Sequence, residues 1–190
     1  MSADMSRTKS KIRGEALARR DAMDVDERIE ASLAAADHLL AHLTIAPAVV
    51  SGFLPIRSEI DIRPLMMGFA DRRARLCVPA IVGSDLQFRE LVRGAPLEPQ
   101  GFGTSAPGAD SAVLDPELML IPLAAFDATG GRIGYGRGYY DRAITDLRTR
   151  GHQPLLVGVA FACQKVDHVP HEPHDVPLDL IVTEAGLNIP

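Results

Sequence analysis

The sequence predicts an α/β fold with a mostly parallel sheet, and the order of its strand-like and helical segments leads to this prediction. An apolar run at residues 118–122, a glycine-rich segment, a helical segment at 139–149 and a second apolar run at 155–161 follow one another along the chain. A strand, a helix and a strand in this order form a crossover that joins two parallel strands. The chain of 190 residues contains no repeat and no linker, so we expect one domain over residues 1–190, with residues 1–5 disordered.

Composition argues against several classes of protein. No apolar run reaches the roughly 18 residues that a membrane-spanning helix needs, and the N-terminus lacks the apolar region of a signal peptide. The net charge of −5 argues against binding to nucleic acid. Cys77 and Cys163 stand alone, without the spacing of a metal site or a disulfide framework. We therefore expect a cytoplasmic protein.

A first helix is expected over residues 6–23. Lys9 and Arg13 lie four residues apart, so a helix places both cations on one face. Neighbouring cations repel each other, and a phosphate between them would relieve that repulsion. The alternative is a solvated basic arm, because lysine and arginine are concentrated near this end of the chain.

A second helix is expected from about Asp24 to Leu43. Asp24 and Glu27 have the spacing of a capping box, and apolar residues then recur with helical spacing at Ile29, Leu33, Ala36, Leu40 and Leu43. His38 and His42 are also four residues apart, a spacing that can bind a metal ion. The sequence offers no third ligand nearby, so we expect exposed or half-buried histidines.

A first strand is expected over residues 48–54, where an apolar run ends at a proline. The loop that follows contains Glu59 and Asp61, and loops that leave the carboxyl ends of parallel strands form the ligand crevice of such sheets. Either carboxylate could serve a ligand, although surface carboxylates are common. Pro64 then opens a helix that runs to about residue 72, and the next strand covers 75–79.

Residues 85–92 alternate between apolar and polar side chains and are expected to form a half-buried strand. Residues 93–116 are rich in Gly, Pro, Ala and Ser and predict a long loop, which in a compact domain is usually a binding loop, a lid or a disordered segment. Phe102 is its only aromatic residue. It could stack on a flat ligand or pin the loop to the core.

Residues 131–142 have the composition of an anion-binding loop. Four glycines allow sharp turns and close approach of backbone N–H groups to a ligand, and Arg132, Arg137 and Arg142 flank them. The segment lacks the Gly-Lys-Ser/Thr of a Walker A loop, and Tyr139 stands where the dinucleotide fingerprint needs its third glycine. The alternative is a tight turn with no ligand.

Asp141 follows this cationic loop by about one helical turn. A carboxylate there is the kind of ligand that magnesium takes together with phosphate oxygens. Asp141 could instead be a favourable first-turn acid or a partner of Arg142. Asp179, at the start of a last strand expected over 178–183, could supply a second carboxylate.

Three histidines, His168, His171 and His174, lie in a segment rich in proline. The prolines prevent a regular helix, so the three-residue spacing does not place the imidazoles on one helical face. We favour a loop that closes over the active site over a zinc site.

Several of these features together resemble the 5-formyltetrahydrofolate cyclo-ligase family. They are Lys9 and Arg13 on a first helix, Glu59 after a first strand, and the sequence from Pro122 through the glycine loop to Asp141. The resemblance covers about residues 6–184. It implies a three-layer α/β/α sandwich with a Rossmann-like sheet. It also implies the conversion of 5-formyltetrahydrofolate and ATP, with magnesium, into 5,10-methenyltetrahydrofolate, ADP and phosphate through a phosphorylated formyl group.

The resemblance also implies roles for individual residues. Arg132 and Tyr139 would act in catalysis, and Asp141 and Asp179 would hold magnesium. The residues expected to contact ATP are Lys9, Arg13, Arg132, Gly134, Tyr135, Gly136, Arg137, Gly138, Tyr139 and Tyr140. Those expected to contact the folate are Leu54, Glu59, Phe102 and Tyr139. We expect the enzyme to work as a monomer.

Two other functions remain open from the sequence. A sugar-phosphate isomerase would use the glycine loop for one phosphate and Glu59 as a base, and a folate-binding protein would hold the folate without converting it. Neither would need ATP. The segment 103–107 also departs from the Gly-Ile-Pro-Glu/Gln-Pro pattern usual in the family, and the role of Arg137 is left open.

Overall fold

A computed structural model of the chain describes residues 3–190, except for the side chains of residues 3, 4 and 102. Its centre is a seven-stranded sheet in the order β11-β10-β9-β6-β1-β2-β3. The five inner strands are parallel, and the edge strands β3 and β11 are antiparallel to their neighbours. The strands are β1 (Val49–Ser51), β2 (Arg75–Val82), β3 (Asp85–Glu90), β6 (Leu118–Pro122), β9 (Leu155–Val159), β10 (Leu180–Thr183) and β11 (Gly186–Asn188).

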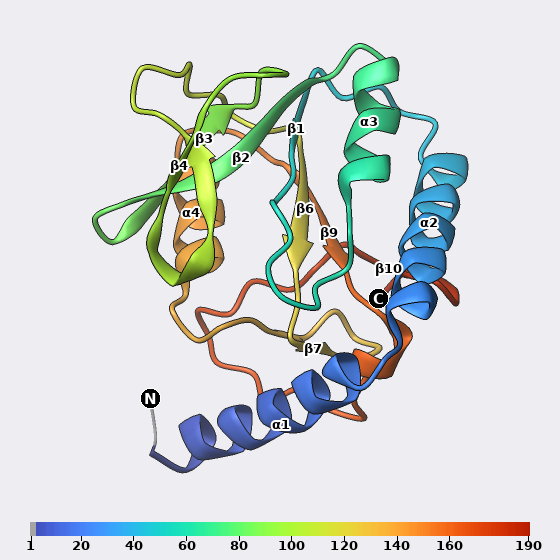
Figure 1. Cartoon of the computed structure of the whole chain (residues 1–190). Helices are drawn as coiled ribbons and strands as arrows, with labels where there is room; N and C mark the ends of the chain where they lie inside the picture. The colour runs from blue at the N-terminus through green and yellow to red at the C-terminus, as the bar shows by residue number, and fades with distance from the viewer. Residues whose placement is uncertain (1–2) are drawn as a thin grey trace.

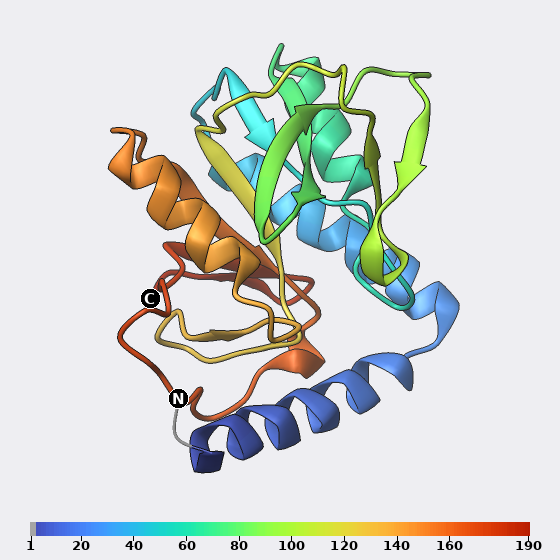
Figure 2. The same ribbon diagram turned by 90° about the vertical axis from the view of Figure 1, so that its left-hand side faces the viewer.

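Helices cover both faces of this sheet, because successive residues of a strand point to opposite sides. In β6, Leu118 and Leu120 face one core, which contains residues of α2 (Val25–His42) and α3 (Arg63–Asp71). Met119 and Ile121 face the other core, with α4 (Tyr139–Thr149). Figure 2 views the molecule from the α4 side, with α2 behind the sheet. The expected three-layer α/β/α sandwich with a mostly parallel sheet is confirmed.

The order of the strands creates a switch point between β1 and β6. From β1 the chain passes through α3 to β2 on one side, and from β6 it passes through α4 to β9 on the other. The loops after β1 and β6 therefore leave neighbouring carboxyl ends in opposite directions. Ligands of open α/β sheets bind in the crevice at such a point.

The first helix, α1 (Ala3–Asp21), lies across this edge of the sheet rather than on a face (Figures 1 and 2). Ala16 of α1 is buried against Ala125, Ile133 and Val169, which belong to segments beyond the carboxyl ends of the strands. The hairpin of β7 (Ala125–Phe126) and β8 (Arg132–Ile133) lies above the helix. The helix begins at Ala3, so residues 3–5 of the segment expected to be disordered are helical.

The N-terminal end of α2 agrees with the sequence, but the face that α2 buries does not. Asp24 caps the helix by accepting a hydrogen bond from the Asp26 N–H at 2.8 Å. Of the apolar residues with helical spacing, Ala36 and Leu43 are buried, whereas Ile29 and Leu33 are 55% and 49% exposed. The buried face consists of Ala31, Ser32, Ala35, Ala36 and Leu39. Small residues allow the helix to lie close to the sheet, and the first apolar residues of the expected stripe, Ile29 and Leu33, face away from it.

Three further differences concern local structure. β1 has only three residues where a strand over 48–54 was expected. The segment 93–116 is ordered by a small hairpin of β4 (Leu97–Pro99) and β5 (Ser105–Pro107), joined by the 3₁₀ turn η1 (Gly101–Gly103). The strand β11 and the β7–β8 hairpin were not expected. No helix in the described residues is long and apolar enough to cross a bilayer.

Candidate functional site

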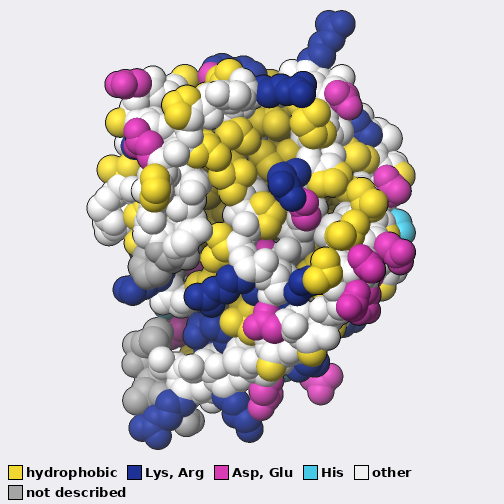
Figure 3. Space-filling model, in the orientation of Figure 1, with side chains coloured by type: hydrophobic (Ala, Val, Ile, Leu, Met, Phe, Trp, Pro, Cys, Tyr) yellow, Lys and Arg dark blue, Asp and Glu magenta, His cyan; other side chains and the backbone are white. Residues whose placement is uncertain are grey.

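Most of the predicted site residues gather where the loops after β1 and β6 meet, at the switch point above α1. Figure 3 shows this face of the molecule, with apolar side chains over its upper centre and basic side chains gathered below them. The glycine loop contributes residues 134–138, most of which are exposed to solvent. The loop after β1 contributes Leu54, half-buried against the core, and Glu59. Two segments about 80 residues apart thus form one site, as parallel sheets allow.

The glycine loop owes its shape to two residues with left-handed backbone. Gly136 has φ of 86° and Gly138 has φ of 63°, a region that side chains with a β-carbon rarely adopt. Gly138 is the N-cap of α4, so the helix begins at Tyr139 directly after the turn. Arg13 supports the loop from below, because its Nε donates to the Gly134 carbonyl at 2.7 Å. Burial lowers the pKa of Arg13, although the guanidinium remains a cation.

Glu59 is joined directly to the glycine loop. Its Oε1 accepts a hydrogen bond from the Tyr135 hydroxyl at 2.6 Å, and its Oε2 accepts one from the Ile56 N–H at 2.9 Å. The side chain borders a cavity of about 180 Å³ whose walls are mostly apolar; α2 contributes Val25, Arg28, Ile29, Ser32 and Leu33, and the loop contributes Asp61 and Pro64. Asp61 is engaged elsewhere, since its carboxylate pairs with Arg63 at 2.6 Å. Of the two candidate carboxylates, Glu59 is the one at the junction of the loops.

Lys9 is neutralised by carboxylates of the C-terminal segment. Its Nζ lies 2.6 Å from Asp175 Oδ2 and 3.1 Å from Glu172 Oε2. Although burial opposes the charge, the hydrogen bonds that Lys9 donates to these two carboxylates leave the pKa of Lys9 raised. Burial likewise opposes ionisation of Asp175, yet Lys9 and the Glu172 N–H hold its pKa below the ordinary value. The predicted repulsion between Lys9 and Arg13 is therefore relieved within the protein.

Arg132 and Asp141 form a largely buried ion pair. Arg132 Nη2 lies 2.6 Å from Asp141 Oδ1, and the arginine side chain is 8% exposed. The same Oδ1 accepts the Val176 N–H at 3.2 Å, and Arg132 Nη1 donates to the Val176 carbonyl. Among the described residues, Asp141 Oδ2 makes no hydrogen bond. The predicted pairing of Asp141 with Arg142 is not observed, because Arg142 donates to backbone carbonyls of Arg137 and Ser84.

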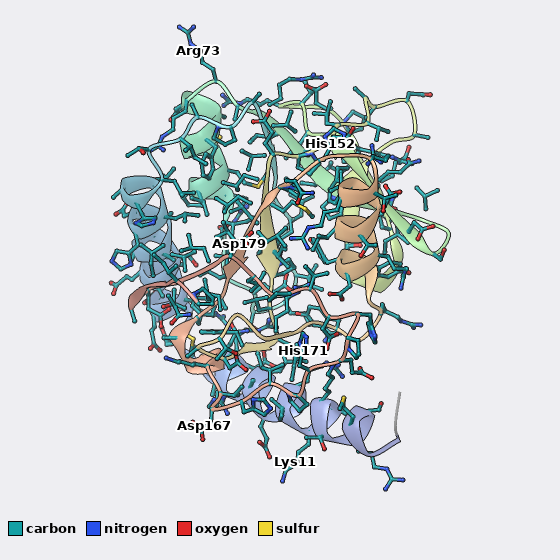
Figure 4. All side chains as sticks on the ribbon, turned by 180° about the vertical axis from the view of Figure 1, so that it is seen from behind. Lys11, Arg73, His152, Asp167, His171 and Asp179 are labelled. Carbon is teal, nitrogen blue, oxygen red and sulfur yellow. The ribbon has the colours of Figure 1, made fainter. Side chains whose placement is uncertain are left out.

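Asp179 is not brought to this cluster. It is exposed, and its Oδ2 accepts the Leu156 N–H at 2.8 Å, at the amino end of β9. Figure 4 shows Asp179 near the middle of the molecule, well above α1, whereas His171 lies beside that helix. Asp175 instead precedes the residue that is hydrogen-bonded to Asp141. Asp175 is a site carboxylate that reasoning from sequence missed, although it stands in the segment singled out for its ligands.

The two tyrosines that begin α4 occupy different surroundings. Tyr139 is half-buried, and the Arg142 guanidinium carbon lies 5.2 Å from the centroid of its ring. Tyr140 packs against the core under α4, and burial, followed by the charge of Glu59, raises the pKa of its phenol. The side chain of Phe102 lies outside the described residues, so its predicted contact with a flat ligand stays a prediction.

The histidines play several structural roles. His38 is half-buried, with its Nδ1 3.2 Å from the Thr183 carbonyl, and His42 is exposed, as expected for these two histidines. His168 and His171 are exposed on the C-terminal segment. Only His174 joins Glu172 and Asp175 in a group with the spacing of a metal site. Since both carboxylates of that group are paired with Lys9, it does not resemble a zinc centre.

One buried residue of the site was not selected from the sequence at all. Arg20, in the last turn of α1, is 2% exposed and donates to Ser58 and Tyr135. A signal for it exists in the spacing. Arg13 and Arg20 are two helical turns apart, so they lie on the same face of α1.

The chain is similar to known proteins over most of its length. The sequence model of the 5-formyltetrahydrofolate cyclo-ligase family matches residues 5–184. The chain is 29% identical over 175 residues to 5-formyltetrahydrofolate cyclo-ligase of Escherichia coli K12, covering 88% of this chain and 95% of that protein. The corresponding protein of Mycoplasma pneumoniae is 28% identical over 179 residues, with coverage of 93% and 98%.

Solved structures show the same fold. The NMR structure of Aquifex aeolicus 5,10-methenyltetrahydrofolate synthetase has a TM-score of 0.78 to this chain at 28% identity, covering 95% of this chain and 92% of that one. The Mycoplasma pneumoniae 5,10-methenyltetrahydrofolate synthetase has a TM-score of 0.75 at 24% identity, covering 93% and 98%.

Proposed function

Because the chain belongs to the 5-formyltetrahydrofolate cyclo-ligase family, we propose that it converts 5-formyltetrahydrofolate and ATP into 5,10-methenyltetrahydrofolate, ADP and phosphate. The observation that carries the proposal is the junction of two loops. The Tyr135 hydroxyl of the glycine loop is hydrogen-bonded to Glu59 of the loop after β1. A nucleotide at the first loop and a folate at the second would therefore be neighbours.

The chain supplies donors and cations for the nucleotide around the glycine loop. Arg13 lies directly beneath the loop, and the exposed turn from Gly134 to Gly138 leads into the N-terminus of α4, where backbone N–H groups favour an anion. Lys9 and Arg132 add two more cations, each already paired with carboxylates. Phosphate oxygens would share these cations with the acidic side chains.

The acidic residues of this cluster fit a magnesium ion. Among the described residues, Asp141 accepts its hydrogen bonds through Oδ1 and makes none through Oδ2. Asp175 accepts hydrogen bonds from Lys9 and from the Glu172 N–H through Oδ2. Magnesium takes one or two carboxylates together with phosphate oxygens, so Asp141 and Asp175 would hold it, in place of the expected pair of Asp141 and Asp179. The ion would neutralise charge on the phosphates during phosphoryl transfer.

The folate would bind beside Glu59. A carboxylate can accept hydrogen bonds from the amino group and ring N–H of a pterin, and Glu59 is already held in place by Tyr135 and the Ile56 N–H. Leu54 and the apolar cavity next to Glu59 offer surfaces for flat rings. We propose that Glu59 orients the pterin and does not act as a base.

The proposed reaction proceeds in two steps. The formyl oxygen attacks the γ-phosphorus of ATP, and ADP leaves, which gives an iminium phosphate. N10 of the folate then attacks the formyl carbon and loses its proton, and phosphate leaves with the former formyl oxygen. Charge spreads over the phosphoryl group in the first step, where Arg13, Lys9 and Arg132 would stabilise it. Tyr139 and the glycine loop would hold the reacting groups next to each other.

The experiment is an absorbance assay with purified protein and 5-formyltetrahydrofolate. We expect the near-ultraviolet absorbance of methenyltetrahydrofolate to appear with MgATP and to be absent without it. Binding of the folate with no absorbance change on addition of MgATP would support a binding protein instead. Turnover of a sugar phosphate without ATP would support the isomerase. The wild-type protein heated past unfolding serves as the blank.

The metal ligands can be tested by three matched substitutions. We expect Asp141→Asn and Asp175→Asn each to raise the magnesium concentration for half-maximal rate by about tenfold or more, since loss of a carboxylate ligand weakens the site. Asp179→Asn should change it less than about twofold, because Asp179 is hydrogen-bonded at the amino end of β9. The reverse pattern, with Asp179→Asn impaired and Asp175→Asn normal, would contradict the assignment.

A further inference from the structure

We propose that Tyr135, held by the buried Arg20, is a positioning residue that sets the Glu59 carboxylate for the folate and couples folate binding to nucleotide binding. This inference rests on the proposed function and adds two residues to it. Tyr135 was expected only as part of the nucleotide loop, and Arg20 was not expected in the site. The argument follows from one connected set of hydrogen bonds.

The bonds run from α1 to Glu59 by way of the glycine loop. Arg20 Nη1 donates to the Tyr135 hydroxyl at 3.2 Å, and that hydroxyl donates to Glu59 Oε1 at 2.6 Å. Arg20 Nε donates to Ser58 Oγ at 3.0 Å. Arg20 therefore holds Glu59 by two routes, through the phenol and through the residue before it in the chain. The carboxylate is left with few alternative orientations.

The burial of Arg20 explains why this arrangement is specific. A guanidinium that is 2% exposed needs compensating partners, because burial of an unpaired charge is costly. Its nearest carboxylate, Asp21, lies 3.8 Å from Nε and is mostly exposed. Glu59 supplies a second negative charge on the other side of the Tyr135 hydroxyl. The cation, the phenol and the carboxylate therefore stabilise one another.

The direction of the hydrogen bond is also determined. Burial and the charge of Glu59 raise the pKa of Tyr135 to about 12, with Arg20 opposing. The phenol is therefore protonated at any pH at which the enzyme would work, and it donates to Glu59 while it accepts from Arg20. The carboxylate keeps its acceptor character toward a ligand.

Tyr135 lies between two parts of the glycine loop that Arg13 contacts. Arg13 donates to the carbonyl of Gly134 on one side of it, and Arg13 Nη2 would lie 3.1 Å from a β-carbon placed at Gly136 on the other side. An anion that binds Arg13 acts on the backbone on both sides of Tyr135. Tyr135 lies within the backbone that a bound nucleotide would displace, and its hydroxyl contacts Glu59, the carboxylate proposed to bind the folate. This double contact is the physical basis of the coupling.

The test measures equilibrium binding of 5-formyltetrahydrofolate by isothermal titration calorimetry, with and without a non-hydrolysable ATP analogue and magnesium. In the wild type we expect the analogue to tighten folate binding by about fivefold or more. Tyr135→Phe removes one hydroxyl and keeps the ring. We expect it to weaken folate binding by about tenfold and to reduce the effect of the analogue to less than about twofold.

A double-mutant cycle separates positioning from a merely structural role. If Tyr135 acts through Glu59, Tyr135→Phe should weaken folate binding by less than about twofold in the Glu59→Gln background. Additive losses in the double mutant would overturn the proposal, as would an unchanged effect of the analogue in Tyr135→Phe. In steady state, the single variant should raise the folate KM by about tenfold, and the ATP KM at saturating folate by only about two- to threefold, because the coupling between the two ligands is reciprocal.

Arg20 has a matched neighbour for comparison. Arg19 lies next to it on α1 but donates to the carbonyls of Cys163 and Lys165, away from the two loops. We expect Arg20→Lys, which keeps the charge but not the fork of donors, to weaken the coupling, whereas Arg19→Lys should leave it within about twofold of wild type. Equal effects of the two substitutions would contradict a specific role for Arg20.

If the wild type shows no MgATP-dependent conversion, the proposed function fails. If the wild type converts the folate but Tyr135→Phe retains the coupling, only this inference fails.

Discussion

At the scale of single residues, Asp127 shows how a buried carboxylate shapes the approach to the glycine loop. It is 2% exposed. Its Oδ1 accepts hydrogen bonds from the Thr129 N–H, the Thr129 hydroxyl and the Gly131 N–H, and its Oδ2 accepts the Val169 N–H at 2.8 Å. One carboxylate thereby fixes the turn between β7 and β8 and attaches the C-terminal segment to it. The negative charge of Asp127 strengthens these hydrogen bonds, because all of its partners are donors.

We expect Asp127→Asn to lower the free energy of unfolding by about 2–3 kcal/mol at neutral pH, since the amide replaces one acceptor by a donor that faces an N–H group. Burial opposes ionisation, but the hydrogen bonds leave the pKa of Asp127 below its usual value of 3.8. A lowered pKa stabilises the fold at pH above the unfolded value and loses this contribution as the pH falls through the folded value. Urea unfolding between pH 7 and pH 3 should show the difference between wild type and variant narrowing below about pH 4. A constant difference would contradict the assignment.

At the scale of elements, α2 illustrates the difference between a helical pattern and a buried face. Apolar residues recur along two stripes of this helix. One stripe, with Leu39 fully buried, packs on the sheet, and the other, with Val25, Ile29 and Leu33, is about half exposed and borders the cavity beside Glu59. The second stripe is therefore available to a ligand without being needed for folding.

We expect Ile29→Gln to change the free energy of unfolding by less than about 0.5 kcal/mol, as is usual for exposed positions. Leu39→Ala in the same helix should cost about 2–5 kcal/mol, because it leaves a cavity in the core. Thermal or urea denaturation of both variants provides the comparison. A large loss of stability in Ile29→Gln would mean that this stripe is part of the core after all.

At the scale of the whole molecule, Lys9 connects the two ends of the chain. It lies on α1, and its carboxylate partners are more than 160 residues away, in the segment that precedes β10. This contact holds α1 across the carboxyl edge of the sheet, where the glycine loop lies. Lys11, two residues further on, has a side chain that is 79% exposed and is 3.9 Å from Glu15. The two lysines form a natural pair for comparison.

We expect Lys9→Met to lower the free energy of unfolding by about 1.5–3 kcal/mol, because Glu172 and Asp175 lose a shared cation. Lys11→Met should change it by less than about 0.5 kcal/mol, as for other exposed pairs. Hydrogen exchange should show faster opening of α1 and of residues 167–177 in Lys9→Met alone. Equal protection in both variants would show that α1 is held by its apolar contacts instead.

Much of the fold could be predicted because its signals are local. The βαβ unit, the helix that begins at Tyr139 and the Pro64 start of α3 depend on residues that are neighbours in sequence. The short β7–β8 hairpin and β11 were missed, since two or three residues carry no periodic pattern. The exposure of Ile29 and Leu33 on α2 was also not predicted, because helical spacing alone does not show which apolar residues face the sheet.

The site was predictable to the same degree. By itself the sequence determined the class of fold and singled out the glycine loop, Glu59 and Asp141 as candidates, because these depend on composition and spacing along one stretch of chain. Only the tertiary structure decided that the residue after Asp175 contacts Asp141 while Asp179 lies elsewhere, that Lys9 is already neutralised, and that Arg20 reaches Tyr135. Those contacts join residues far apart in the chain, and they are set by strand order and register, which bring distant segments to one edge of the sheet.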